Sequence, residues 1–396
     1  MLTSKRPILI IGGGIGGAAA ALALRQAGLD AVVYEARSQR GTRYGGCYVL
    51  WYAGMQSLRR LGVADKVRAA GHRVDRFEMC DERGRLLYRV DMDSRSVEPG
   101  LRPLAIRRAD VVDILHAELG SEALQLNSTL REFRETAAGV DAIFTNGRVE
   151  TGQVLIGADG LHSRVRAHLH GLSPARHPGY AHWSGIAETD CGAPQHVFRI
   201  MHGNAARFAF FHLGDGRVNW WCTRNAPAGS DGDHLGELRA LETAYRGWHP
   251  IVGDLLAATA PESVHRRDTV DRPPLRRWGR GRITLLGDAA HAMTFDLGQG
   301  AGTSLTDGVT LAHHLSRRGA PIAALRDYER ARRAVTVPLA LASRRIGEAT
   351  GWRGPFGPQM NHLILRTIGA RITPTLLALD ARSHSALDME LSHAVR

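Results

Sequence analysis

The sequence contains few cysteines, almost no lysine and no long apolar run. The cysteines are Cys47, Cys80, Cys191 and Cys222. They show neither C-x-x-C nor zinc-ligand spacing, so we expect reduced thiols, no redox disulfide and no metal site. No run of about eighteen or more apolar residues occurs, which argues against a membrane-spanning helix. An apolar strand is expected almost at the start, which leaves no room for a signal peptide and favours a cytoplasmic location.

Positive charge predominates in the sequence. The net charge is +12, and nearly all of the basic residues are arginine. The only lysines are Lys5 and Lys66. Such a charge is either spread over solvated faces or attracts an anionic dinucleotide or substrate. Nucleic-acid binding is not expected, because no basic block is interleaved with aromatic residues and no nucleic-acid-binding motif is present.

A dinucleotide-binding pattern occupies the first 35 residues. An apolar run at 8–11 leads into glycines at G-x-G-x-x-G spacing, an Ala- and Leu-rich stretch at 18–27 and a second apolar run at 31–34. The glycines are Gly12, Gly14 and Gly17, and Glu35 stands at the end of the second run. The pattern predicts strand, tight turn, helix and strand, with the first N–H groups of the helix facing a pyrophosphate.

Glu35 indicates which dinucleotide binds in this turn. A carboxylate at this position accepts hydrogen bonds from ribose hydroxyls and repels a 2′-phosphate. We therefore expect the adenosine of FAD or NAD here, and not that of NADP. A glycine-rich packing turn without a ligand is the alternative interpretation.

Two further apolar runs end in glycine and aspartate. One leads into the sequence GADG at 157–160, and Ser163 is expected to cap a basic helix at 164–170. The other leads into GDAAH at 287–291 and then into GQGAG at 298–302. Ligands collect at the carboxyl ends of parallel strands, so Asp288 is expected at the ligand edge of a sheet. A helix cap is the alternative role for Asp159 and Asp288.

The middle of the chain has the alternating pattern of a sheet. The stretches 207–213 and 217–223 predict two strands joined by a Gly-Asp-Gly turn. We expect substrate-pocket residues on them, namely Arg207, Phe211, His212, Asn219 and Trp221. Arg207 either holds an anionic or carbonyl group or forms a surface ion pair, and His212 is a candidate base for a phenol. Trp183 and Trp221 either stack on a planar substrate or pack in the core.

The order and spacing of the three glycine motifs resemble the single-component FAD-dependent aromatic monooxygenases of the p-hydroxybenzoate hydroxylase type. The resemblance covers roughly residues 1–345. It implies an α/β fold, in which a Rossmann-like FAD-binding domain carries an inserted mixed β-sheet substrate domain and C-terminal helices. We expect the FAD-binding domain at 1–75, 104–172 and 270–345, the substrate domain at 76–103 and 173–269, and a C-terminal helical segment at 346–396.

The resemblance also implies roles for individual residues. Glu35 holds the adenosine ribose, Arg108 contacts FAD near its pyrophosphate and ribityl chain, and Asp288 binds the ribityl hydroxyls. Asp159 belongs to a motif linked to FAD and the nicotinamide cofactor, and a backbone group of Leu130 meets the adenine. The flavin ring and the oxygen site lie against the backbone at 298–302. The expected cofactor-binding residues are Gly12, Gly14, Ile15, Gly17, Glu35, Arg43, Arg108, Leu130, Asp159, Asp288, Gly298, Gly300, Ala301 and Gly302.

The chain departs from the family pattern near the expected oxygen site. Phe295, beside Asp296, stands where family members usually have proline, and Gly302 and Thr306 replace the usual Asn and Glu. FAD binding should be retained, because the glycines and Asp288 remain. The shape of the oxygen pocket, and with it the substrate, is expected to differ. Phe295 is therefore a further pocket candidate.

The leading hypothesis is an NAD(P)H-dependent monooxygenase. NAD(P)H reduces FAD, O2 adds at flavin C4a, and the hydroperoxide hydroxylates or epoxidises an electron-rich aromatic or polycyclic small molecule. No second G-x-G-x-x-G follows a strand, so we expect NADH or NADPH to dock transiently. No Ser/His/Asp constellation is present, and no catalytic side chain is singled out.

Two other flavoprotein classes are alternatives. A non-oxygenating FAD oxidase, dehydrogenase or reductase would keep the FAD motifs but would not consume NAD(P)H and O2 together. A flavin halogenase is disfavoured, because the sequence has no W-x-W-x-I-P stretch. A homodimer is a possible assembly.

Overall fold

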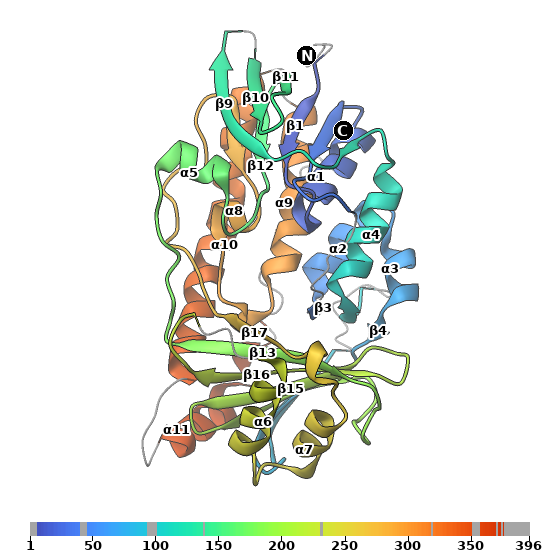
Figure 1. Cartoon of the computed structure of the whole chain (residues 1–396), viewed down its shortest axis with the longest axis vertical. Helices are drawn as coiled ribbons and strands as arrows, with labels where there is room; N and C mark the ends of the chain where they lie inside the picture. The colour runs from blue at the N-terminus through green and yellow to red at the C-terminus, as the bar shows by residue number, and fades with distance from the viewer. Residues whose placement is uncertain are drawn as a thin grey trace.

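A computed structural model describes residues 6–39, 46–92, 101–137, 139–229, 233–317, 320–350, 357–369, 371–373 and 375. Figure 1 shows two layered parts, with a parallel sheet and its helices in the upper half and a larger sheet across the lower half. A long helix, α10 (Pro321–Thr350), runs along one side of both. Within the described residues, no helix combines the length and the apolar character that spanning a membrane requires.

The upper part is built on a five-stranded parallel sheet of order β18-β12-β1-β2-β8. Its strands are β1 (Ile8–Ile11), β2 (Ala31–Tyr34), β8 (Leu124–Gln125), β12 (Leu155–Gly157) and β18 (Ile283–Leu285). They are continuous apolar runs because both faces of the sheet are buried, one by helices and the other by a small antiparallel sheet, which contributes Phe144 beside Tyr34. The helices of this part are α1 (Ile15–Gln26), α2 (Tyr52–Arg60), α3 (Ala64–Ala70), α4 (Arg108–Leu119), α5 (Arg164–His170), α8 (Asp288–His291) and α9 (Gly300–Arg317).

Two small antiparallel sheets accompany the parallel one. One is a meander of β9 (Leu130–Thr136), β10 (Gly139–Phe144) and β11 (Val149–Gly152), and the other joins β3 (Cys47–Leu50), β7 (Leu104–Arg107) and β4 (His72–Arg73). The pattern at 49–61 predicts a helix throughout, but the helix begins only at Tyr52. Val49 and Leu50 instead pair with β7, so the prediction is wrong for the first residues of that stretch.

The lower part is a seven-stranded sheet of order β17-β13-β16-β15-β14-β5-β6. Its strands are β5 (Arg76–Asp81), β6 (Leu86–Asp91), β13 (Tyr180–Ala187), β14 (Val197–Gly203), β15 (Ala206–His212), β16 (Val218–Asn225) and β17 (His265–Asp268). Only β5 and β14 pair in parallel, so the sheet is mixed. The alternating pattern at 77–90 predicts a hairpin, which β5 and β6 form, and the two strands predicted at 207–213 and 217–223 are confirmed as β15 and β16.

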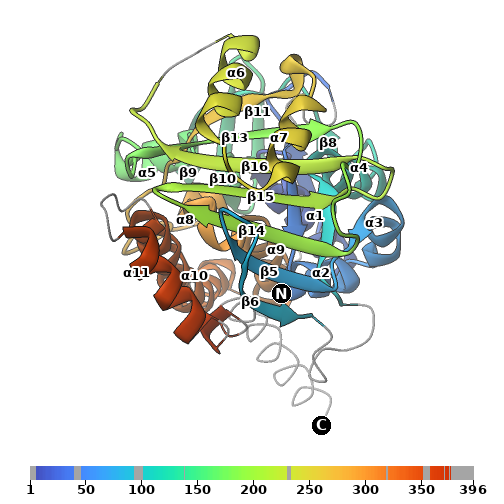
Figure 2. The same cartoon turned by 90° about the horizontal axis from the view of Figure 1, so that it is seen from below.

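The two faces of this sheet have different partners. Phe208, Phe210 and Trp220 pack under α6 (His234–Ala244) and α7 (Pro250–Ala257), which cover the outer face in Figure 2. The alternate residues Phe198 and Phe211 face the upper part. Because side chains alternate between the two faces of the sheet, the same strands contribute to the core under α6 and α7 and, on the opposite face, to the wall of a cavity.

The C-terminal residues close the remaining side. The helix α11 (Gly357–Ile364) is followed by a π-helical turn, η3 (Leu365–Gly369), and the Tyr88 hydroxyl of β6 hydrogen-bonds Thr373 Oγ1 at 2.9 Å. The expected α/β fold, with a Rossmann-like parallel sheet, a mixed sheet and C-terminal helices, is confirmed. The exact domain boundaries stay a prediction.

Candidate active site

Three glycine-containing turns meet at the carboxyl edge of the parallel sheet. A Cβ at Gly12, whose φ is +105°, would lie 2.5 Å from the carbonyl oxygen of Ala158 in the turn after β12. A Cβ at Gly16 would lie 2.6 Å from Leu286, which follows β18. Glycine is needed at Gly12 both for its backbone conformation and for this close approach. The three motifs therefore form one continuous surface.

The first turn of α1 presents backbone N–H groups without intrahelical partners. Gly14 is the N-cap residue and no side chain caps the helix. The first α-helical bond runs from Ala18 N to Gly14 O at 2.9 Å, and nothing lies within 4 Å of the position of a Cβ on Gly14. Open space, free N–H groups and the positive end of the helix dipole together suit a phosphate group. Gly14, Ile15 and Gly17 thus form a turn that fits a pyrophosphate.

Glu35 lies at the end of β2 with its carboxylate against this turn. Its Oε2 accepts a hydrogen bond from Gly13 N at 2.7 Å, and its Oε1 accepts one from Arg37 N at 3.0 Å. Each carboxylate oxygen retains acceptor capacity for a ribose hydroxyl. Arg43 lies outside the described residues.

The two aspartates have different surroundings. Asp159 caps α5, because its carboxylate accepts from Ser163 Oγ at 2.5 Å, Arg164 N at 2.7 Å and Val165 N at 3.2 Å. Burial raises the pKa of Asp159 against the effect of these bonds. Asp288 is the exposed first residue of α8, and its carboxylate has no hydrogen-bond or ion-pair partner among the residues that the structure covers. Ser163 is also an N-cap of α5, as predicted.

Arg108 and Leu130 are the two other expected cofactor contacts outside the glycine turns. Arg108 begins α4, and its charge acts on the pKa of Tyr48, which burial raises. The Tyr48 hydroxyl is buried, and within the described chain it has no hydrogen-bond partner. The carbonyl of Leu130 accepts a hydrogen bond from Arg164 Nη1 at 2.9 Å. The backbone N–H of Arg108 donates to Gly46 O at 3.0 Å, and Gly46 and Tyr48 both line the cavity, so Arg108 stands at the rim of the cavity.

The start of α9 also meets the cavity. Gly298 follows the short helix η2 (Phe295–Leu297) with φ +63°, and a Cβ there would lie 2.9 Å from Trp51 Nε1. The buried Trp51 Nε1 has no acceptor among the described residues. The helix begins with Gly300, Ala301 and Gly302, so no long side chain covers its first N–H groups. An unpaired indole N–H beside an open helix end fits the polar edge of a flavin ring.

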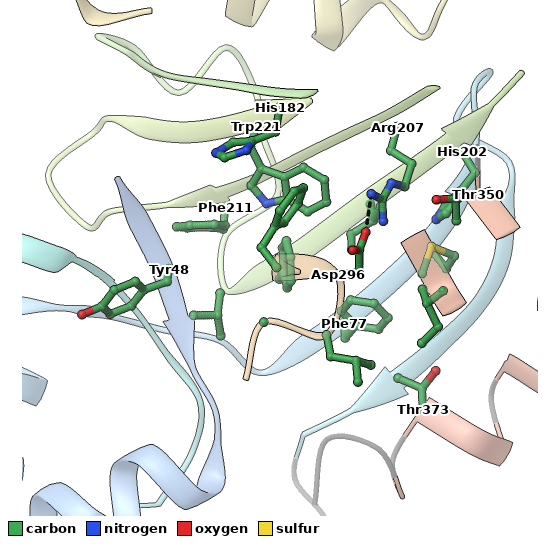
Figure 3. A pocket seen from close by; sticks show the side chains of 18 of the residues that line it. Tyr48, Phe77, His182, His202, Arg207, Phe211, Trp221, Asp296, Thr350 and Thr373 are labelled. Carbon is green, nitrogen blue, oxygen red and sulfur yellow. Dashed lines mark hydrogen bonds and ion pairs between the residues drawn. The ribbon is translucent and has the colours of Figure 1, made fainter. Parts of the chain in front are cut away.

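A cavity of about 440 Å³ lies between the two parts of the molecule (Figure 3). The expected pocket residues that line it are Arg207, Phe211, Asn219, Trp221 and Phe295. Most of the remaining wall is apolar, including Trp51, Phe77, Met79, Phe198, Ile200 and Leu365. Its size and apolar character suit a planar aromatic molecule.

His212 and Trp183 do not line the cavity. His212 alternates with Phe211 and faces the other way: its Nε2 is 2.8 Å from Ala193 O and its Nδ1 is 3.3 Å from Gln195 Nε2. His212 therefore cannot act as a base on a substrate bound in this cavity. Trp183 packs in the outer core and donates from Nε1 to Glu237 Oε2 at 2.7 Å, which confirms the packing alternative for this residue.

Arg207 forms a buried ion pair in the cavity wall. Its Nη2 donates to Asp296 Oδ1 at 2.6 Å, and the two side chains are 4 % and 0 % exposed. The Tyr180 hydroxyl donates to Asp296 Oδ2. One alternative for Arg207 was an ion pair on the surface. Its ion pair with Asp296 is buried instead. Asp296 and Tyr180 were not expected in the site; 89 residues separate Arg207 from Asp296, so no local pattern joins them.

Two histidines of the wall are held neutral. Burial, with a further effect from Arg267, lowers the pKa of His182 to about 4. Burial, with a further effect from Arg207, lowers the pKa of His202 to about 3. His182 alternates along β13 with the core residue Trp183, and this alternation places the His182 side chain on the cavity face. Near neutral pH both rings offer hydrogen bonds without charge.

Comparisons with known proteins agree with this geometry. The family model described as FAD binding domain matches residues 5–340. The aurachin C monooxygenase/isomerase of Stigmatella aurantiaca is 33 % identical over 363 residues, which cover 92 % of this chain and 94 % of that protein. The chloroplastic zeaxanthin epoxidase of Solanum lycopersicum is 34 % identical over 351 residues, which cover 83 % of this chain but only 52 % of the epoxidase.

A solved structure is similar over nearly the whole chain. The HpxO protein of Klebsiella pneumoniae, complexed with FAD and uric acid, superposes with a TM-score of 0.87 at 29 % identity. The match covers 96 % of this chain and 98 % of HpxO.

Proposed function

Because this chain belongs to the FAD binding domain family and is an FAD-dependent monooxygenase, we propose that it oxygenates an aromatic or polycyclic molecule held in the cavity between its two sheets. The substrate, O2, NAD(P)H and a proton give the oxygenated product, NAD(P)+ and water. The position of the cavity carries the proposal, because Leu297 and Gly298, next to the start of α9, form part of its wall. When bound, FAD supplies the redox chemistry, by accepting hydride from NAD(P)H and activating O2.

The residues at the sheet edge bind and orient the cofactor. The turn from Gly12 to Gly17 holds the pyrophosphate, Glu35 the ribose and Asp288 the ribityl hydroxyls. The open N–H groups at Gly300, Ala301 and Gly302 stabilise negative charge on the flavin ring. The support for these roles is the convergence of three turns on one surface and the absence of partners for Asp288 within the described residues.

The cavity wall orients the substrate and excludes water. Trp221 and Phe211 offer aromatic faces to a planar ring. His182 and His202 are neutral and serve as hydrogen-bond partners for the ring substituents. The apolar wall limits the access of water to the reacting oxygen.

Substrate-stimulated oxidation of NADH or NADPH by the purified, FAD-loaded protein tests this function. A panel of phenols, indoles, purines and quinolones is offered under 18O2, and the products are weighed by mass spectrometry. We expect at least one compound to stimulate oxidation and to gain one labelled oxygen atom. A colourless protein that takes up no FAD would contradict the proposal. Substrate oxidation without label would favour the non-oxygenating alternative.

Location and assembly are separate proposals. Cys47, Cys80, Cys191 and Cys222 are all free thiols that form no disulfide, which supports a cytoplasmic location. A homodimer stays a prediction, and light scattering of the eluting protein measures it.

A further inference from the structure

The Arg207–Asp296 pair is sealed into the cavity wall. Arg207 lies under three aromatic rings, 5.8 Å from the centroid of Tyr180, 5.6 Å from that of Trp221 and 5.7 Å from that of Phe295. Behind the pair, α10 approaches so closely that a Cβ at Gly347 would lie 2.6 Å from Asp296 Oδ2. Water cannot screen the two charges from this side. Each charge therefore depends on the other for compensation.

Asp296 leaves no net positive charge at Arg207 for an anion to use. Figure 3 shows the two side chains pointing toward each other across the cavity wall. A substrate carboxylate that approached Arg207 would enter the field of the Asp296 carboxylate, and like charges repel strongly where the dielectric constant is low. Burying that carboxylate would also remove its hydration without a full counter-charge.

Arg207 keeps the ability to donate hydrogen bonds. Its Nε donates to Thr223 Oγ1 at 3.0 Å and its Nη2 to Asp296 Oδ1 at 2.6 Å. A guanidinium carries more N–H groups than these two bonds use. A carbonyl or hydroxyl oxygen of an uncharged molecule can accept from a remaining N–H group.

Among the described residues, one further ionised side chain, Arg267, lines the cavity. It lies on β17 in register with His182 of β13, and the His182 ring packs on Phe295 with 4.7 Å between the ring centroids. Arg267 is unchanged in the Asp296→Asn variant described below, so the comparison of that variant with the wild type reports on the charge at Arg207.

We propose that Asp296 determines specificity by neutralising Arg207, so that the cavity accepts uncharged aromatic molecules and rejects anionic ones of the same shape. This inference rests on the proposed function, since it names the substrate class of the same cavity. The ligand is a planar, uncharged ring system with a carbonyl or hydroxyl oxygen directed at Arg207.

A matched pair of ligands tests this inference in the FAD-loaded protein. The probes are 2-naphthamide and 2-naphthoate, which share one ring system and differ in charge at pH 7.5. Binding is measured by calorimetric titration. We expect the wild type to bind the amide at least about tenfold more tightly than the carboxylate.

Two variants separate charge from shape. Asp296→Asn keeps the size of the side chain and leaves Arg207 positive, so the preference should reverse by roughly tenfold in favour of the carboxylate. Glu78→Gln is the control, because Glu78 pairs with Arg199 on the same sheet, at 2.7 Å, but faces away from the cavity. This variant should keep the wild-type preference. FAD content and thermal unfolding are recorded for each protein.

Several results would overturn the inference. They are equal or tighter binding of naphthoate by the wild type, binding of neither ligand, or a folded Asp296→Asn protein with an unchanged preference. The wild-type measurement decides even where the variant does not fold. Failure of the proposed function is distinguishable, because it appears as loss of FAD binding or of substrate-stimulated NAD(P)H oxidation, whatever the preference for charge.

Discussion

Asp288 and Asp159 follow similar strand-to-turn sequences but have different surroundings, and we propose different roles for them. Asp288→Ala should weaken FAD binding by about tenfold or more, because it removes charged acceptors for the ribityl hydroxyls. Asp159→Ala should lower the free energy of unfolding of the apoprotein by about 1 kcal/mol, because α5 loses part of its cap. Flavin fluorescence titration and urea unfolding measure the two effects. An Asp288→Ala protein with wild-type FAD affinity would contradict the assignment.

Buried histidines should make stability depend on pH. The folded-state pKa is lowered from 6.5 to about 4 for His182 and to about 3 for His202. Between these values and 6.5 the unfolded chain binds more protons, so stability falls as pH decreases from about 6.5 toward about 4. Each histidine adds a slope of at most about 1.4 kcal/mol per pH unit.

His182→Gln tests this pH dependence. Urea unfolding at several pH values between 7 and 4 should give a shallower slope for the variant than for the wild type. His162→Gln alters an exposed histidine and should leave the slope unchanged. Identical slopes for all three proteins would show that His182 is not held neutral in the fold.

At the scale of single residues, the sequence predicts those roles that depend on residues close by in the chain. Gly12 and Gly17 are recognisable because a turn between strand and helix fixes their spacing. Alternation along β15 places Arg207 and Phe211 on one face and, by the same rule, puts His212 on the other. Asp296 could not be predicted as the partner of Arg207, because only tertiary folding brings η2 against β15.

Helix α9 is fixed in place by one buried carboxylate. Asp307 accepts from Gly287 N at 2.9 Å, His291 Nε2 at 2.6 Å and Arg332 Nε at 2.6 Å. Burial acts to raise the pKa of Asp307, but His291 and Arg332 lower it to about 2. This carboxylate ties together α8, α9 and α10, and it holds the amide of the residue before Asp288.

Asp307→Leu should destabilise the protein by about 3–5 kcal/mol, because it removes the buried carboxylate that accepts from the Arg332 and His291 side chains. Urea unfolding of the apoprotein measures the loss. Asp65→Asn removes an exposed i,i+3 pair with Arg68 and should change stability by less than about 1 kcal/mol. A loss of the same small size in both variants would argue against the network.

Elements with a strong period were predictable, and short ones were not. The apolar runs of β1, β12 and β18 and the alternation of β15 and β16 identify these strands. The prediction of a helix from residue 49 was wrong because Val49 and Leu50 complete a small sheet with β7. That pairing joins residues that are 54 (Leu50 with Leu104) to 60 (Cys47 with Arg107) positions apart, and no short window of the sequence contains both segments.

On the scale of the molecule, three distant parts of the chain enclose the cavity. Trp51 comes from the FAD-binding part, Phe211 from the seven-stranded sheet and Leu365 from the C-terminal turn. The C-terminal contribution was not predicted, because a helical pattern at 360–368 gives no indication of what it covers. The arrangement predicts that η3 contributes to substrate binding without affecting FAD.

Leu365→Ala should weaken binding of an aromatic ligand several-fold, because it removes apolar area from the cavity wall. FAD affinity should stay at the wild-type value. Leu363→Ala is the control, since Leu363 is 58 % exposed and does not line the cavity. Calorimetric titration with 2-naphthamide compares the three proteins, and equal affinities would exclude η3 from the site.

Strand order also sets when the cofactor can be captured during synthesis. Strand β18 is an edge strand of the parallel sheet, and the turn after it carries Asp288. A nascent polypeptide that ends before residue 283 would contain Glu35 and the glycine turn proposed to bind the pyrophosphate, but it would lack Asp288, the proposed partner of the ribityl hydroxyls. Tight binding of FAD should therefore begin late in synthesis, after about three quarters of the polypeptide has left the ribosome.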